Sequence, residues 1–142
     1  MSEYNFYGWE SADVQDRNGL CPVDYYDILS GIWCAETCAP RLRKNWSAQN
    51  KTMGQCSVTA FLIQDFFGGD VYGILRPGGN YHCFNVVGDC IFDLTSEQFG
   101  DEILDYSICT KQSREIHFAS EEKKKRYEYL KTKVIEVLQG EK

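Results

Sequence analysis

The central stretch of the sequence is Lys51-Thr52-Met53-Gly54-Gln55-Cys56-Ser57-Val58-Thr59-Ala60, in which a polar, glycine-containing loop runs into the longest apolar, helix-like segment. The pattern predicts a helix from Ser57 to Phe67. Gly68-Gly69 is suited to end it, because glycine readily takes the left-handed conformation that stops a helix. Cys56 therefore falls in the first turn of the predicted helix.

The position of Cys56 has a chemical consequence. The first N–H groups of a helix lack intrahelical acceptors, and together with the helix dipole they favour an anion. A thiol in this position has a lowered pKa and forms thiolate more readily. Thiolate is both a nucleophile and a metal ligand, so the stretch alone is compatible with either chemistry.

Length and composition indicate a single domain, residues 1–142. A chain of 142 residues with 43% hydrophobic content can bury a core of its own. The net charge of -6 and the isoelectric point near 4.9 argue against a nucleic-acid partner, which would need clustered Lys and Arg. Neither a signal-peptide pattern nor an apolar run of membrane-spanning length is present, so we expect a cytoplasmic protein with no membrane partner.

The cysteines bear on the choice between nucleophile and metal ligand. Their number, seven, is odd, and without a signal peptide most thiols should be free. Cys83 lies in an apolar, strand-like segment, where we expect it to pack as a small hydrophobic residue. Cys34 and Cys38 could bind zinc with Cys83 or His82, but their spacing fits common zinc sites poorly. We therefore expect no metal and no other cofactor.

The two ends of the chain flank this centre. Residues 1–20 are polar with scattered aromatics and predict an irregular arm that docks on the body. Pro22 suits a first helical position, and apolar residues at helical spacing predict a helix from Pro22 to Ile32. Ser120 is a suitable N-cap for a packing helix over residues 121–139.

The segment from Arg41 to Lys51 is basic and rich in amides. Charge runs usually face water, so we interpret it as a solvated connection. The alternative is a wall of a substrate site that carries an amide donor such as Gln49 or Asn50.

Beyond the central helix the apolar period changes from 3.6 to 2. Strands are predicted at residues 71–76, 81–87 and 90–94, followed by a helical turn at residues 96–99. Residues 115–118 also alternate and predict a strand that carries His117. His117 lacks a comparably placed acid, so it is a reserve candidate for a catalytic base.

The loop Gly88-Asp89 suits a two-residue type II′ hairpin. Val87 then lies opposite Cys90, and this register sets His82 and Asp93 on one face as diagonal neighbours. Diagonal Cβ atoms are about 7 to 8 Å apart, a gap that an imidazole and a carboxylate together can span. A slip of one residue would separate the two side chains. A base and an orienting acid on one face, downstream of a helix-capping cysteine, are typical of nucleophilic catalysis.

Four segments carry a resemblance to known proteins, and they are Gly54 to Ala60, Gln64 to Gly69, His82 to Val86 and Asp93 to Phe99. They resemble the YunG-like family of small bacterial proteins over roughly the middle third of the chain. They also look like a compact papain-like cysteine peptidase core, with the Cys, His, Asp order of transglutaminase-like relatives. The resemblance implies an α+β fold in which a central helix carrying the cysteine packs on a small antiparallel sheet. It also implies that Cys56 is the nucleophile, His82 the base and Asp93 the orienting acid.

We therefore expect a cysteine hydrolase or acyl transferase that acts on the amide or ester carbonyl of a peptide, a protein or a small amide. The backbone N–H of Cys56 and one side-chain amide would stabilise the oxyanion, and Gln55, Gln49 and Asn50 are the candidates. Peptidase, amidase, deamidase and transglutaminase-like activities all fit. The alternatives are a non-catalytic interaction or regulatory module of papain-like fold, and a zinc-binding domain.

Overall fold

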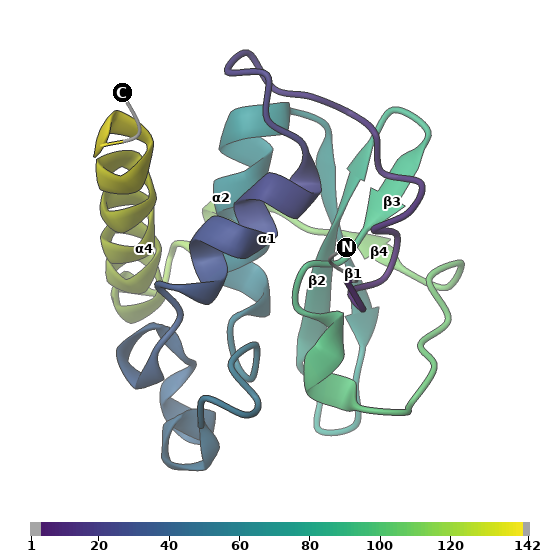
Figure 1. Ribbon diagram of the computed structural model, residues 1–142. Coiled ribbons are helices and arrows are strands. Elements are labelled where there is room, and N and C mark those ends of the chain that lie inside the picture. Colours follow the sequence, from purple (N-terminus) through teal and green to yellow (C-terminus); the bar gives the residue numbers. More distant parts are fainter. Residues whose placement is uncertain (1–3, 141–142) are drawn as a thin grey trace.

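The computed structural model describes residues 4–140, which form an α+β fold (Figure 1). Its elements in chain order are α1 (Pro22–Ser30), η1 (Ala35–Thr37), η2 (Pro40–Asn45), α2 (Cys56–Phe67), β1 (Asp70–Leu75), β2 (Tyr81–Val87), β3 (Cys90–Phe92), η3 (Ser96–Phe99), β4 (Thr110–Lys111), α3 (Arg114–His117) and α4 (Glu121–Gly140), where η marks a 3-10 helix. The strands form one antiparallel sheet in the order β3-β2-β1-β4.

Helix α2 is the central element and lies between the sheet and α4 (Figure 1). Residues 58–63 are all buried, as expected for a helix that is covered on both sides. Gly68 ends the helix with a φ of +77°, and Gly69 follows with a φ of +72°. A Cβ at Gly69 would come within 2.3 Å of the Val86 carbonyl oxygen, so only glycine lets the chain pass this close to the sheet. The predicted helix and its end at Gly68 are confirmed, with Cys56 as the first helical residue. The predicted left-handed helical conformation is wrong, because the ψ of Gly68 is -150°.

Strands β2 and β3 form the hairpin that carries the candidate site. Val87 pairs with Cys90, as the sequence predicted. Gly88 has a φ of +60°, whereas Asp89, like every other described non-glycine residue, has no positive φ. That combination identifies a type II′ turn rather than type I′. The predicted two-residue loop and its register are therefore confirmed.

The N-terminal arm packs on this hairpin and on α1. Phe6 is fully buried, and its ring stacks on that of Tyr26 with centroids 5.0 Å apart. Just past β3, the backbone N–H of Asp93 donates to the Tyr7 carbonyl at 3.0 Å. β3 is thus shorter than predicted, because the arm takes over the pairing at its end. The predicted docking of the arm is confirmed.

The predicted strand at residues 115–118 is wrong. Most of this segment belongs to the short helix α3, because the Ser113 side chain caps it by accepting the N–H of Ile116 at 3.3 Å. The edge of the sheet is formed instead by β4, which pairs with β1. Helix α1 also ends earlier than predicted, at Ser30.

Helix α4 covers the face of α2 that the sheet leaves open. The predicted N-cap is confirmed, since Ser120 Oγ accepts the N–H of Lys123 at 3.2 Å. Tyr127, Leu130 and Val134 are buried against the body, as their spacing predicted. Among the described residues, no helix has the length and apolar character needed to cross a membrane.

Candidate active site

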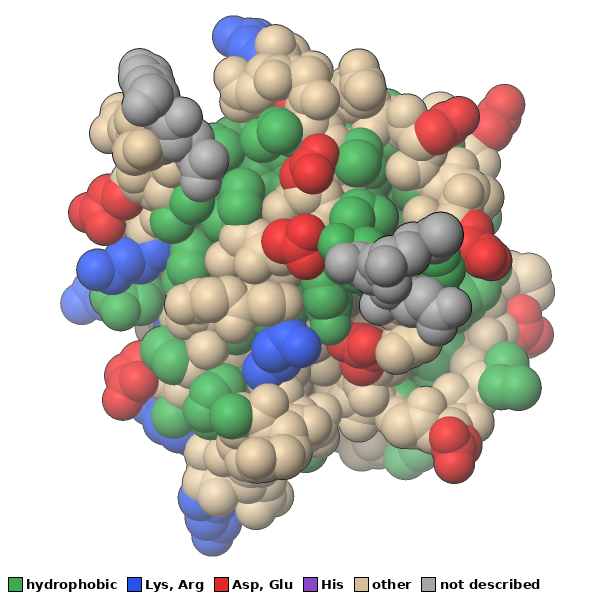
Figure 2. All heavy atoms as spheres, viewed as in Figure 1, with side chains coloured by type: hydrophobic (Ala, Val, Ile, Leu, Met, Phe, Trp, Pro, Cys, Tyr) green, Lys and Arg blue, Asp and Glu red, His purple; other side chains and the backbone are tan. Residues whose placement is uncertain are grey.

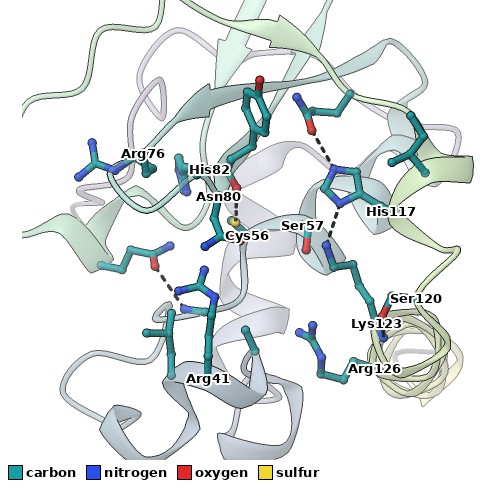
Figure 3. Close-up of a pocket in the computed structure, with 18 of the residues that line it drawn as sticks. Arg41, Cys56, Ser57, Arg76, Asn80, His82, His117, Ser120, Lys123 and Arg126 are labelled. Carbon is teal, nitrogen blue, oxygen red and sulfur yellow. Dashed lines mark hydrogen bonds between the residues drawn. The ribbon is translucent and has the colours of Figure 1, made fainter.

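A cleft of about 860 Å³ opens at the start of α2. Its walls come from the start of η2, the turn between β1 and β2, η3, β4, α3 and the start of α4. In the view of Figure 3, Cys56 lies near the middle, with His82 to one side of it and His117 to the other. All three residues line the cleft, so the structure brings the candidate nucleophile and both histidines to one place.

Cys56 is partly exposed to this cleft. Its Sγ lies 3.8 Å from the Tyr81 carbonyl oxygen, the contact drawn as a dashed line in Figure 3. Because Cys56 and Ser57 are the first two residues of α2, their backbone N–H groups have no acceptor within the helix. The sulfur and two available N–H donors therefore sit at the same helix end.

His82 and Asp93 are in direct contact. Nε2 of His82 lies 2.5 Å from Oδ2 of Asp93, and only 2% and 1% of the two side chains are exposed. The Tyr106 hydroxyl donates to the same oxygen at 2.7 Å, and the Thr95 N–H donates to Oδ1 at 3.2 Å. Asp93 is thus held at both oxygens and in turn fixes the His82 ring. No sequence pattern pointed to Tyr106, because it lies in a loop between η3 and β4.

The second ring nitrogen of His82 faces a different environment. Within the described residues, the buried Nδ1 has no hydrogen-bond partner of normal geometry. Since Nε2 contacts Asp93, Nδ1 is the ring nitrogen available to exchange a proton with Cys56. Burial by itself lowers the pKa of His82, but the Asp93 carboxylate, with a smaller contribution from Cys56, outweighs burial and raises this pKa to about 10.

The pKa of Cys56 moves in the opposite direction. A hydrogen bond from the Cys83 thiol lowers it well below its ordinary value, burial opposes this, and the His82 ring lowers it further. A low pKa for Cys56 beside a high pKa for His82 favours a thiolate and an imidazolium at neutral pH. The arrangement therefore supplies a charged nucleophile together with a proton donor.

Cys83 follows the base in sequence and is almost completely buried. Its hydrogen bond to Cys56 raises the pKa of the Cys83 thiol well above its ordinary value, so Cys83 stays protonated. The prediction that Cys83 packs in the core is confirmed. Its effect on the pKa of Cys56 was not predicted.

The loop before α2 is anchored at Gly54. Its N–H donates to the Gln98 side-chain oxygen at 3.2 Å, and its carbonyl accepts from the Ala39 N–H at 2.9 Å. Gly54 has a φ of +71°, and a Cβ there would lie 2.5 Å from Cys38 Sγ. Glycine is therefore required for the close approach that fixes the start of α2.

The predicted amide donors do not reach the cleft. Gln55 is fully buried, and its side-chain nitrogen donates to the Cys34 carbonyl at 3.1 Å. Gln49 and Asn50 lie in a turn that is closed by a 3.0 Å bond from the Asn50 N–H to the Ser47 carbonyl, and neither lines the cleft. The turn at residues 47–50 is thus a connection outside the cleft, as the charge pattern of the segment indicated.

Three other amide side chains line the cleft, those of Asn80, Gln98 and Gln112. Gln98 is occupied, since it accepts from Gly54 and donates to the Thr95 carbonyl. Gln112 is also engaged, with its oxygen 2.8 Å from Nε2 of His117. Asn80 is exposed in the turn before β2, and its side chain makes no hydrogen bond with any described residue. Asn80 replaces the predicted amides as the candidate donor.

His117, the reserve candidate for the base, has no acidic partner among residues 4–140. Its Nδ1 lies 2.9 Å from the Lys123 ammonium. Burial, together with the charge of Lys123, lowers the pKa of His117 to about 4, so the ring is neutral at physiological pH. His82, with its carboxylate and high pKa, is the better placed base.

The residues of the alternative zinc site, Cys34, Cys38, Cys83 and His82, do not assemble. Over residues 4–140, no three His, Cys, Asp or Glu side chains are arranged to hold a metal ion. Cys34 and Cys38 flank η1, and Cys38 is buried there.

Comparison with known proteins identifies the family. The model of a family described as "YunG protein" matches residues 22–139. The "Uncharacterized protein YunG" of Bacillus subtilis (strain 168) is 41% identical over 54 residues, which are 38% of this chain and 46% of that protein. No solved structure matches the chain. The family model covers most of the sequence, with Cys56, His82 and Asp93 inside the match, and the protein therefore belongs to the YunG family, as its motifs predicted.

Proposed function

We propose that the protein is a papain-like cysteine hydrolase or acyl transferase that uses Cys56, His82 and Asp93 on an amide or ester carbonyl. One observation carries the proposal. The His82 ring is held through Nε2, 2.5 Å from a buried carboxylate, and its other nitrogen remains for a cysteine at a helix start. The Cys, His, Asp order of these residues and the carboxylate that holds the ring support the roles of nucleophile, base and orienting acid.

In the first step the Cys56 thiolate attacks the carbonyl carbon, a C–S bond forms, and the π electrons move onto the oxygen. The unpaired N–H groups at the start of α2 stabilise this oxyanion, and we assign Asn80 as the side-chain donor. The intermediate collapses, the bond to the leaving group breaks, and His82 Nδ1–H protonates the departing amine or alcohol.

The second step releases the acyl group. Neutral His82 accepts a proton from water, or from an acceptor amine, which attacks the thioester carbonyl. The Cys56 thiolate leaves and His82 becomes imidazolium again. Asp93 holds the Nε2–H throughout, so that Nδ1 always faces the reacting atoms.

The fold gives additional support. A helix that begins with the nucleophile packs against an antiparallel sheet, and one hairpin of that sheet carries the base and leads directly into the acid. This is the layout expected of a papain-like core. Fold alone does not define function, so the proposal depends on the site.

The test is acylation of the protein by a panel of peptide and small-molecule acyl esters, detected as a mass increase and mapped to a residue. We expect a hydroxylamine-sensitive thioester on Cys56, absent in Cys56→Ser and unchanged in the matched control Cys90→Ser. Cys90 is also partly exposed but lies outside the cleft. Acylation at several cysteines, or acylation that survives Cys56→Ser, would contradict the proposal.

A further inference from the structure

The cleft beside Cys56 is basic although the protein is acidic. Its described lining contains no Asp or Glu, and its Lys and Arg residues are Arg41, Arg76, Lys111, Lys123 and Arg126. The whole chain has 21 acidic and 15 basic residues. Figure 2 shows acidic side chains spread over one face of the molecule, from its left edge to its right. The charge of the cleft is therefore a local feature that average composition does not explain.

Three of these cations are compensated by carboxylates outside the lining. The ion pairs are Arg76 with Glu102 at 2.8 Å, Lys111 with Asp70 at 3.2 Å and Arg126 with Glu122 at 2.5 Å. Arg41 and Lys123 make no ion pair with a described carboxylate within 4 Å. In the part of the chain that the structure describes, these two positive charges of the cleft thus have no carboxylate partner.

Lys123 is held in place by a neutral group. The Gln112 side-chain oxygen accepts the Nε2–H of His117, which leaves His117 Nδ1 as an acceptor for the Lys123 ammonium at 2.9 Å. The chain Gln112–His117–Lys123 (Figure 3) therefore positions the ammonium without cancelling its charge. Orienting a cation in this way is useful when the anion comes from a ligand.

Arg41 approaches the cleft from a different element. It lies in η2, whereas Lys123 lies in the first turn of α4. Both residues line the same cleft as Cys56, and in Figure 3 they appear on different sides of its sulfur. Both charges therefore border the cleft that Cys56 also lines.

We infer that the substrate of this site is anionic and carries a carboxylate close to the carbonyl that Cys56 attacks, with Lys123 and Arg41 as the residues that bind it. This inference rests on the proposed function and adds the substrate class. An acyl group of glutamate or aspartate type has the required chemistry. A cationic substrate would meet like charges at Lys123 and Arg41.

The first experiment compares alkylation of Cys56 by iodoacetate, which carries a carboxylate, and by iodoacetamide, its neutral analogue. A nearby unit charge in water changes the ratio of the rates for the charged and the neutral reagent by about fivefold. We expect the ratio of the iodoacetate rate to the iodoacetamide rate to fall about three- to tenfold in Lys123→Gln and in Arg41→Gln. Lys124→Gln is the matched control, because it removes the same charge from an exposed position of α4 outside the cleft.

The two rates separate the inference from the proposed function. A fast iodoacetamide reaction at Cys56 with a ratio that neither cleft variant changes would overturn the anionic substrate and leave the nucleophile intact. Slow iodoacetamide reaction in the wild type would contradict the nucleophile itself. Thermal melts of each variant confirm that it is folded.

The second experiment tests for a carboxylate as such, through protection of Cys56 from iodoacetamide by small ligands. N-acetylglutamate should protect, whereas N-acetylglutamine should not, and the protection should disappear in Lys123→Gln. Inorganic phosphate serves as a third ligand. Equal protection by phosphate and N-acetylglutamate would show that the site binds anions in general, and would contradict the preference for a carboxylate. Protection by N-acetylglutamine alone would overturn the inference.

Discussion

Asp93→Asn is the most informative substitution, because it keeps the size of the side chain and removes only its charge. The carboxylate accepts from Tyr106 and from the Thr95 N–H, and it contacts Nε2 of His82. If the Asn oxygen stays with Thr95, its NH₂ group points at Nε2 and forces the ring proton onto Nδ1. If the amide is reversed, its NH₂ group opposes the Thr95 N–H. Either way the imidazolium loses its counter-charge.

The size of the effect follows from the pKa of His82. A tenfold change in a protonation equilibrium corresponds to about 1.4 kcal/mol, so raising this pKa from 6.5 to about 10 favours imidazolium by about 5 kcal/mol. Burial opposes charge on the ring, so the whole increase depends on the partners, with Asp93 the largest. Without it the ring is neutral near pH 7 and the thiolate loses its main cation. We expect Cys56 to react between about 10²- and 10⁴-fold more slowly.

The assay is the pH profile of Cys56 alkylation by iodoacetamide, with thermal melts of the same samples. The variant should still fold, because a neutral His82 next to an amide leaves no buried charge unpaired. Near pH 7 its melting temperature should nevertheless fall by roughly 10 °C or more, because the stabilisation that the charged His82–Asp93 pair contributes is lost. Asp89→Asn, in the exposed hairpin turn, is the matched control and should behave as the wild type. An unchanged profile together with an intact melt would refute the role of Asp93.

Three further predictions concern the surroundings of the triad. Tyr106→Phe removes the hydroxyl that donates to Asp93 at 2.7 Å, and alkylation of the nucleophile should slow by about three- to tenfold with little change in the melt. In Gly54→Ala an alanine must adopt a φ of +71°, and its Cβ lies 2.5 Å from Cys38 Sγ, so the free energy of unfolding measured in urea should fall by about 1–3 kcal/mol. The raised pKa of His82 gives a stability contribution that is complete below pH 6.5 and is lost as the pH rises through about 10. The difference in melting temperature between wild type and Asp93→Asn should therefore be largest in mild acid and shrink above about pH 10.

Local patterns predicted the parts of the site that adjacent residues determine. The apolar run with its two glycines defined α2 and placed Cys56 at its start, because period and stop signals act within a few residues. The loop Gly88-Asp89 fixed the hairpin register, and with it the contact between His82 and Asp93.

The remaining parts depend on contacts between distant segments. Tyr106 reaches Asp93 from a loop with no period, and Tyr7 pairs with Asp93 from the far end of the chain. The helical turn at His117 replaced a predicted strand because the Ser113 cap outweighed a short alternating pattern. The amides Gln49 and Asn50 were favoured by their nearness to Cys56 in sequence, which did not correspond to nearness in space.

The most direct test of the central claim is the rate of iodoacetamide modification of each of the seven cysteines near pH 6.5, measured by peptide mapping. The account predicts that Cys56 reacts at least about tenfold faster than any other cysteine, and that its rate stays nearly constant from about pH 6 to 8, where ordinary thiols still accelerate. Uniform modification, or a Cys56 rate that rises with pH like that of an ordinary thiol, would contradict it.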